Sequence, residues 1–281
     1  MNEPALHNAD ADVVAGFGDE WARFDQEAVP EAEITRRFDE YFSVFPWASL
    51  PSGAEGFDAG CGSGRWARHV APRVGKLNAV DASPQALGVA QKALASLKNV
   101  NFITASVAEM PLADASQDFG YSLGVLHHMP DTQSGLDACV RKLKPGAPFL
   151  VYLYYRFDNR SAWFRALWRV SDAVRRRVSV LPHGPRYAVS QIIAALVYWP
   201  LARLAWLMER LGLSPAALPL SFYRDKAFYT MHTDALDRFG TRLEQRFTRG
   251  EITAMMQKAG LTGICFREAE PFWCAVGVRA S

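Results

Sequence analysis

The sequence predicts an α/β fold in which a mostly parallel β-sheet carries helices on both faces. Three observations predict it. Strand and helix patterns alternate from about residue 55 to residue 155, a glycine-rich turn follows the first of these strands, and a further helix-and-strand pattern returns near the C-terminus. The chain has 281 residues, of which 49% are hydrophobic, so it can build one large core or one domain that carries an insertion.

The part of the chain before the core is expected to be helical. Residues 12–25 place four apolar side chains on one helical stripe: Val14, Phe17, Trp21 and Phe24. Pro46 and Pro51 then mark a loop. We therefore expect an N-terminal helical segment over residues 1–48 and a core that begins at residue 49 and continues to residue 155.

Five strands are predicted within this core. The first two are residues 56–59, which run into the glycine turn, and residues 77–80, which end at Asp81. Ser83 and Pro84 then fit the N-cap and the first residue of a helix that extends to Leu97. The other three predicted strands are residues 100–103, 119–123 and 149–154.

One more helix and two more strands are predicted at the C-terminal end, in residues 247–281. A capping box begins the helix at Thr248, and Gly260 is expected to end it. Alternating apolar residues predict strands around 264–266 and 272–278. We expect these two strands to be antiparallel and joined by a tight turn.

Between the two parts of the core lies a mostly helical insertion, residues 156–246. Its first part, residues 156–212, holds ten Arg, no Lys and three acidic residues, a net charge of +7, together with four of the eight tryptophans. The uncharged stretch 187–202 is too short to span a bilayer and contains Pro200, so no transmembrane helix is expected.

The overall composition argues against several classes of function. A net charge of +2 and a pI of about 8.3 do not indicate a nucleic-acid partner. The four scattered cysteines form no C-x-x-C pair, so neither a metal site nor a disulfide framework is expected. The polar and acidic residues at the start of the sequence do not resemble a signal peptide, so the expected location is the cytoplasm.

The run from Asp58 to Arg65 is typical of a cofactor-binding turn. Glycines at such a turn let the backbone approach a ligand closely. A dinucleotide fingerprint would need a third glycine at position 65 or 67, where this chain has Arg65 and Ala67. Asp81 lies 21 residues beyond Gly60, where a carboxylate can accept hydrogen bonds from ribose hydroxyls. The alternative is a tight turn with no ligand.

This run resembles motif I of the class I S-adenosylmethionine (SAM)-dependent methyltransferases, in the subgroup similar to the ubiquinone and menaquinone methyltransferases (methyltransferase type 11). Further segments match the family in order: residues 17–21, 108–111, 123–128 and 143–146. The resemblance implies a Rossmann-like sheet of seven strands, six parallel and one antiparallel, with a helical lid inserted after the fifth. It covers residues 55–155 and 248–281 well and the insertion poorly.

The resemblance also implies SAM as cofactor and assigns residues to it. Gly60, Cys61 and Gly62 would offer backbone to the methionine end, and Leu123 would offer backbone near its amino acid group. Asp81 would hold the ribose, and Ser106 and Val107 would lie beside the adenine. Asp58 and Ala82 are assigned to the same cofactor site. Many members carry Asp in place of Ser106, and a neutral hydroxyl accepts more weakly. Trp21 would cover the cofactor, although its place on the apolar stripe fits simple packing as well.

His127 and His128 follow the fourth strand and are the candidate catalytic residues. An imidazole there can deprotonate a hydroxyl or a carbon acid beside the methyl group. The resemblance favours His128, and the alternative is that both rings only shape the acceptor site. The segment 228–239 is rich in polar and aromatic residues and would either close that site or form a solvated lid helix, with Asp237 and Arg238 on its exposed face.

The function expected from the resemblance is methyl transfer from SAM to an oxygen or carbon of a small or lipid-like acceptor. Two alternatives are other chemistry on SAM and a catalytically silent SAM-binding subunit. The basic, tryptophan-bearing insertion further suggests peripheral contact with an anionic membrane, at the inner face, through Arg175, Arg176 and Arg177. The alternative is a soluble lid. Neither the acceptor nor the oligomeric state can be read from the sequence.

Overall fold

The computed structural model describes residues 7–24 and 29–281, which divide into two compact units. The first unit comprises Ile34–Asp158, Leu243–Ser281 and the described residues before position 25. The second comprises Asn159–Arg242 together with residues 29–33. Each unit is described by itself.

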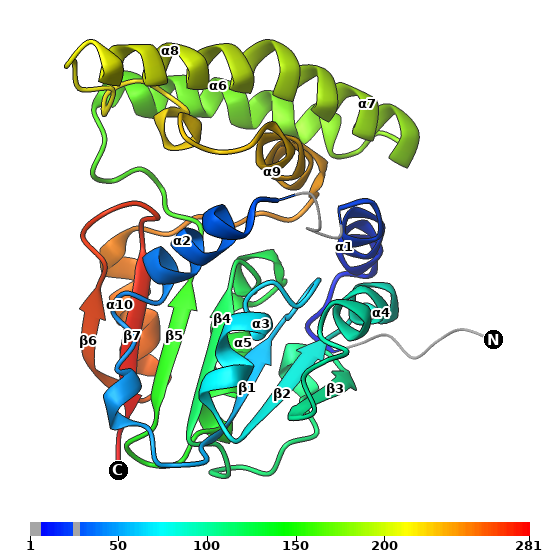
Figure 1. Cartoon of the computed structure of the whole chain (residues 1–281), viewed down its shortest axis with the longest axis vertical. Helices are drawn as coiled ribbons and strands as arrows, with labels where there is room; N and C mark the ends of the chain where they lie inside the picture. Colours follow the sequence, from blue (N-terminus) through cyan, green and yellow to red (C-terminus); the bar gives the residue numbers. More distant parts are fainter. Residues whose placement is uncertain (1–6, 25–28) are drawn as a thin grey trace. The chain divides into compact units, whose positions relative to one another are not determined.

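The first unit is built on a seven-stranded sheet in the order β3-β2-β1-β4-β5-β7-β6 (Figure 1). The strands are β1 (Glu55–Ala59), β2 (Lys76–Asp81), β3 (Val100–Thr104), β4 (Phe119–Leu123), β5 (Pro148–Tyr152), β6 (Leu261–Phe266) and β7 (Cys274–Arg279). Only β7 runs antiparallel to its neighbours β5 and β6. The predicted sheet of six parallel strands and one antiparallel strand is confirmed.

Helices cover both faces of this sheet. They are α2 (Glu31–Tyr41, whose first turn belongs to the second unit), α3 (Ala67–Val70), α4 (Pro84–Ala93), α5 (Thr132–Lys142) and α10 (Arg249–Lys258), while α1 (Ala11–Arg23) packs against α4. Phe149 and Val151 of β5 pack in the cluster that contains residues of α5 and α10, whereas Leu150 packs with residues of α2 and α3. This alternation follows from the two-residue period of a strand.

Helices α4 and α10 begin at the capping residues that the sequence predicts. The Ser83 hydroxyl accepts from the Ala86 amide at 3.3 Å, which caps α4. Thr248 and Glu251 form the expected capping box of α10. Helix α4 ends at Ala93 rather than Leu97, because Leu94 leaves helical geometry and packs into the core.

The prediction of a tight turn between the last two strands is wrong. Residues 267–273 separate β6 from β7. In this connection Trp273 is buried against Phe266, and its indole N–H donates to Asp158 at 3.0 Å. The aromatic residues that the alternation pattern assigned to a strand therefore pack on the core from a loop.

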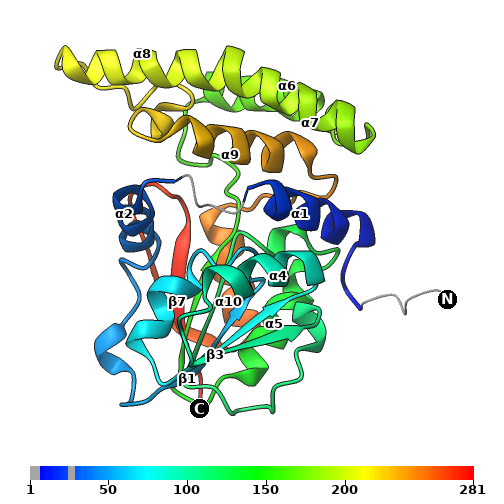
Figure 2. The ribbon, with the colours of Figure 1, turned by 45° about the vertical axis from the view of Figure 1, so that its right-hand side comes forward.

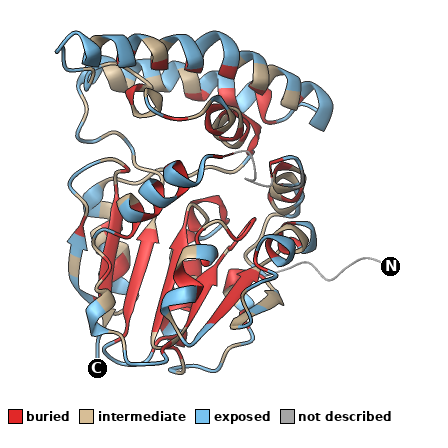
Figure 3. Cartoon of the chain, viewed as in Figure 1, coloured by how far each residue is buried: buried red, intermediate tan, exposed pale blue. Residues whose placement is uncertain are grey.

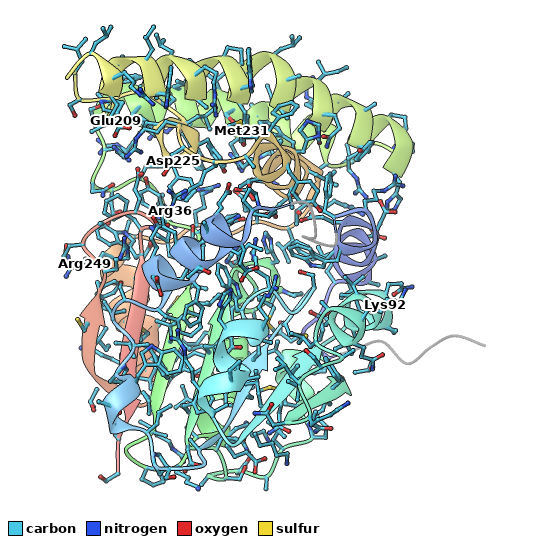
Figure 4. All side chains as sticks on the ribbon, in the orientation of Figure 1. Arg36, Lys92, Glu209, Asp225, Met231 and Arg249 are labelled. Carbon is cyan, nitrogen blue, oxygen red and sulfur yellow. The ribbon has the colours of Figure 1, made fainter. Side chains whose placement is uncertain are left out.

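The second unit is helical, with α6 (Ala162–Val178), α7 (His183–Ile193), α8 (Trp199–Arg210) and α9 (Phe228–Gly240). Helix α9 packs against the other three through a core that includes Met231, Tyr198 and Val178 (Met231 is labelled in Figure 4). Helix α6 runs beside α7 and α8, and α9 lies on one side of this layer (Figures 1 and 2).

Helices α7 and α8 form one continuous helix, His183–Arg210, because a π-helical turn at Ala194–Tyr198 joins them. This helix has 28 residues, and in the described part of the chain it alone is long and apolar enough to cross a membrane, judged by length and composition. The expectation of no such helix rested on the shortness of the uncharged stretch 187–202 and on Pro200 within it, whereas the helix continues through Arg203 to Arg210. Instead Pro200 lies in the first turn of α8, directly after the π-helical turn.

Candidate functional site

The glycine turn after β1 is closely packed by side chains from two other segments. Gly60 and Gly62 have φ angles of +83° and +53°, which disfavour residues with a Cβ. A Cβ on Gly60 would lie 2.5 Å from the methyl groups of Val125, and one on Gly62 would lie 2.9 Å from the Trp21 indole nitrogen. Trp21 therefore lies directly over the turn, where the resemblance expects it to cover a cofactor.

Asp81 at the end of β2 links this turn to α4. One carboxylate oxygen accepts from the Gly62 amide and the other from the Ser83 amide, both at 2.8 Å. Burial raises the pKa of Asp81, while backbone N–H groups of Ser83, Gly62 and Ala82 oppose this rise. Each oxygen retains a further lone pair, so the carboxylate can also accept from two ligand hydroxyls.

Asp58 lies beneath the turn and is 1% exposed. Within the described residues, neither of its carboxylate oxygens has a well-formed hydrogen bond. Burial raises the pKa of Asp58 to about 8, and Asp81 adds to the rise, whereas the Tyr121 hydroxyl and Arg65 lower it. A cationic group of a ligand would compensate the carboxylate.

This raised pKa predicts how the ligand-free protein responds to pH. The pKa in the fold lies above the value of about 3.9 in an unfolded chain, so the contribution of Asp58 to stability is complete below pH 4 and is lost as pH rises through about 8. Asp58→Asn removes the titration. The variant should therefore lose less free energy of unfolding than the wild type between pH 5 and 8.5, by more than about 1 kcal/mol.

Denaturant unfolding at both pH values measures this difference. Asp39→Asn removes an exposed carboxylate on α2 and is the matched control, which should keep the wild-type pH dependence. An Asp58→Asn variant whose pH dependence equals that of the wild type would contradict the assignment.

His127 is fully buried in the short turn after β4. Its ring lies 3.9 Å from the Tyr154 ring and 4.0 Å from the His128 ring, centroid to centroid. Burial lowers the pKa of His127 well below its usual value, and the charges of His128 and Arg246 lower it further. Neither ring nitrogen has a hydrogen-bond partner among the described residues. The geometry is that of a neutral packing residue.

His128 is held in a defined orientation instead. Its Nδ1 lies 2.7 Å from the Leu243 carbonyl oxygen, and its ring packs against Phe17 of α1 at 5.0 Å. Because a carbonyl only accepts, the neutral ring carries its proton on Nδ1 and has an acceptor at Nε2. Of the two histidines, His128 is the one arranged to take up a proton.

A buried ion pair beside these rings was missed from the sequence. The Arg246 Nε lies 2.7 Å from Glu244, and the guanidinium lies 5.0 Å from the centre of the Tyr154 ring. Burial disfavours the charge on Arg246, yet the Glu244 carboxylate keeps its pKa raised. No local sequence pattern indicates that Glu244 and Arg246 lie beside Tyr154. Two segments far apart in the sequence are brought together there, because Phe247 forms a β-bridge with Tyr155.

Residues expected beside an adenine lie near the N-terminal segment. The buried Ser106 hydroxyl donates to the His7 carbonyl at 3.0 Å. Asn8 binds the backbone of Asp131 twice, accepting from its N–H and donating to its carbonyl, both at 2.8 Å. These hydrogen bonds hold His7 and Asn8 near Ser106 and Asp131. The sequence alone does not indicate these contacts.

The remaining predicted positions are distributed as follows. Cys61, Val107 and Leu123 are buried, and Ala82 is half-buried beside Asp81. Segment 228–239 lies in α9, a core helix of the second unit. The expectation of a solvated Arg238 is wrong, because the Arg238 side chain is largely buried and lies 3.8 Å from Asp172. Residues 7–24 and 29–281 contain no group of three or more metal-ligating side chains.

Comparison with known sequences finds similarity to methyltransferases in this part of the chain. Residues 57–151 match a family model described as a methyltransferase domain. An O-methyltransferase from Aspergillus nomiae is 31% identical over 145 residues, covering 48% of this chain and 62% of its own. A ubiquinone biosynthesis O-methyltransferase from Xanthomonas axonopodis is 30% identical, covering 50% and 59%. A demethylmenaquinone methyltransferase from Bacillus licheniformis is 27% identical, covering 39% and 55%. The chain thus spans about three fifths of these relatives' length.

Solved structures support the same fold. A methyltransferase from Bacillus halodurans superposes with a TM-score of 0.51 at 15% identity, covering 83% of this chain and 72% of its own. The YcgJ protein from Bacillus subtilis gives a TM-score of 0.52 at 13% identity, covering 86% and 98%. At this level of identity the likeness concerns the fold alone.

Proposed function

We propose that the chain is a SAM-dependent methyltransferase, since residues 57–151 match a family model described as a methyltransferase domain. The observation that carries this proposal is the constellation at the end of β1 and β2. It combines a glycine turn in which Gly60 and Gly62 leave no room for a Cβ, the Asp81 carboxylate and the buried Asp58 carboxyl.

These residues fit SAM. The ammonium group of its methionine end would compensate the Asp58 carboxylate, which has no well-formed hydrogen bond in the described structure. The ribose hydroxyls would donate to Asp81. The Ser106 oxygen, whose proton is given to His7, retains lone pairs that can accept from the adenine amino group. Trp21 would cover the cofactor above Gly62.

When bound, SAM supplies a methyl group activated by its sulfonium. The protein must then orient the acceptor, exclude water and take up a proton. Nε2 of His128 is the acceptor nitrogen for that proton, with Nδ1–H held by the Leu243 carbonyl. His127 and Tyr154 pack beside it and exclude water. The Arg246–Glu244 pair provides fixed polar groups next to the aromatic rings.

We propose an oxygen or carbon of a small, lipid-like acceptor as the methylated atom. The relatives named for ubiquinone biosynthesis and as a demethylmenaquinone methyltransferase support an acceptor of quinone-like character. The aromatic surroundings of His128 support it too, since the rings of Phe17, Tyr154 and His127 pack around it.

Transfer of a labelled methyl group tests the function. Purified protein with methyl-labelled SAM should transfer label to the organic phase of a cell lipid extract, and Gly62→Val should abolish transfer. Label appearing in the aqueous fraction alone would contradict a lipid-like acceptor. Tight SAM binding without incorporation into any fraction would favour a catalytically silent subunit over an enzyme.

A further inference from the structure

The second unit carries the large exposed hydrophobic side chains of the described residues. Every large hydrophobic side chain exposed in the described part of the chain lies there, between Trp163 and Phe228. Pale blue marks exposed residues along α6, α7 and α8 in Figure 3, whereas the strands of the sheet are largely buried. Apolar exposure concentrated on one unit marks an interaction surface.

Helix α6 exposes its apolar side chains and buries charged ones, which is the reverse of a typical helix in a soluble domain. Four apolar residues at helical spacing form one exposed stripe, each between 43% and 64% exposed: Trp163, Leu167, Val170 and Val174. The opposite face buries an ion pair between Asp172 and Arg175, with Nε and Oδ1 2.8 Å apart. Arg175 also donates to the Thr241 carbonyl at 3.0 Å. Because soluble helices bury their apolar stripe, this one is built to meet an apolar medium.

The long helix formed by α7 and α8 presents a second stripe beside the first. Its inner face packs on α9 through Ala194, Tyr198 and Ala202. Its outer face exposes Ile192, Leu196, Trp199, Trp206 and Leu207. Helix α9 contacts α6 through the same core, which includes Val178. The exposed stripes of α6 and of the long helix therefore lie outside the core that these helices share with α9.

Positive charge borders these stripes. Residues 159–242 contain thirteen basic and five acidic residues. Arg169 and Arg177 are exposed on α6, where Arg177 follows Val174 by one helical turn. The exposed Arg210 lies over the Trp206 ring at 4.7 Å. Arginine with tryptophan around an apolar stripe is the composition of helices that lie at the surface of anionic membranes.

We propose that α6 and the α7–α8 helix dock in the plane of an anionic lipid bilayer, with their apolar stripes inserted at the boundary between headgroups and acyl chains. The charge complementarity commits the surface to lipid rather than to a second copy of the chain. In-plane docking follows because the inner face of the long helix is fixed to α9 and carries the buried Arg186, which a spanning helix would expose to acyl chains.

The three arginines Arg175, Arg176 and Arg177 do not contribute equally to this exposed charge. Arg175 cannot attract lipid, because it is buried and bonded to Asp172 and Thr241. Of the Arg175–Arg177 cluster only Arg176 and Arg177 are exposed, and Arg176 pairs with Asp172 at 2.9 Å. The three arginines look alike in the sequence, and only packing separates them.

Sedimentation of the full chain with vesicles tests the proposal without depending on methyl transfer. Protein should pellet with phosphatidylglycerol-containing vesicles at low salt, remain soluble with pure phosphatidylcholine, and be released at high salt. Arg169→Gln with Arg177→Gln should weaken partitioning by roughly tenfold or more. Leu167→Gln with Val170→Gln should weaken it while circular dichroism and melting stay unchanged.

Lys92→Gln with Lys98→Gln removes the same charge from exposed positions of the first unit and should bind like the wild type (Lys92 is labelled in Figure 4). Protein that stays in the supernatant with anionic vesicles at low salt would overturn the proposal. So would resistance to alkaline carbonate extraction, which indicates a spanning helix. The proposal would also be overturned if the protein formed a dimer at micromolar concentration without lipid and the Leu167 and Val170 changes dissociated that dimer. The stripes would then face a second copy of the chain.

Discussion

Replacing His128 by Ala is expected to lower kcat by roughly 10²–10⁴-fold and to leave the affinity for SAM nearly unchanged. The reason is geometric: the Leu243 carbonyl fixes the proton on Nδ1, so Nε2 is the acceptor that the variant removes. Steady-state kinetics and calorimetry together separate the two effects.

His127→Phe is the matched control for this change. It keeps an aromatic ring between Tyr154 and His128 and removes a histidine whose pKa burial holds well below its usual value. A loss of less than about tenfold in kcat is expected for it. A similarly small loss for His128→Ala would leave His128 as a residue that shapes the acceptor site, and catalysis would then rest on alignment alone.

Gly62→Val should abolish measurable SAM binding, and Asp81→Ala should weaken it by more than tenfold. The first places a side chain where Trp21 already lies within 2.9 Å of a Cβ. The second removes an acceptor for two charge-assisted hydrogen bonds, about 1.5–3 kcal/mol. Asp81→Asn keeps the shape of the side chain and should lose less than the alanine variant.

Gly53→Val separates loss of the site from general backbone strain. Gly53 has a φ of +70° in the loop before β1, and nothing lies within 4 Å of its Cβ position. This variant should be destabilised but should bind SAM with wild-type affinity at a temperature where it is folded. Equal loss of binding in both glycine variants would mean that strain, rather than the approach of the backbone to a ligand, explains the Gly62 result.

The sheet could be predicted because its signals are local. Buried parallel strands appear as short apolar runs, and Ser83 and Thr248 begin their helices with side-chain oxygens that the sequence displays directly. The glycine turn and Asp81 could be placed together for the same reason, since consecutive parallel strands end at one edge of the sheet.

What escaped prediction depends on contacts between distant segments. Nothing near His128 in the sequence indicates that Leu243 would orient it, or that Glu244 and Arg246 would pair beside Tyr154. The contact of Ser106 with His7 joins residues 99 positions apart.

Helix α6 shows a different limit. An apolar stripe such as Trp163–Val174 predicts a helix, but its period is the same whether that face is packed or exposed. Only the buried Asp172–Arg175 pair on the opposite face shows which way the helix points.

Calorimetric titration of the purified chain with SAM and with S-adenosylhomocysteine tests the central claim most directly. Binding of both at micromolar concentration, without added metal or phosphate, is the predicted result, and the Gly62→Val protein should show none. Tight binding of NAD with no heat from SAM or S-adenosylhomocysteine would contradict the assignment of the glycine turn, of Asp58 and of Asp81 to this cofactor.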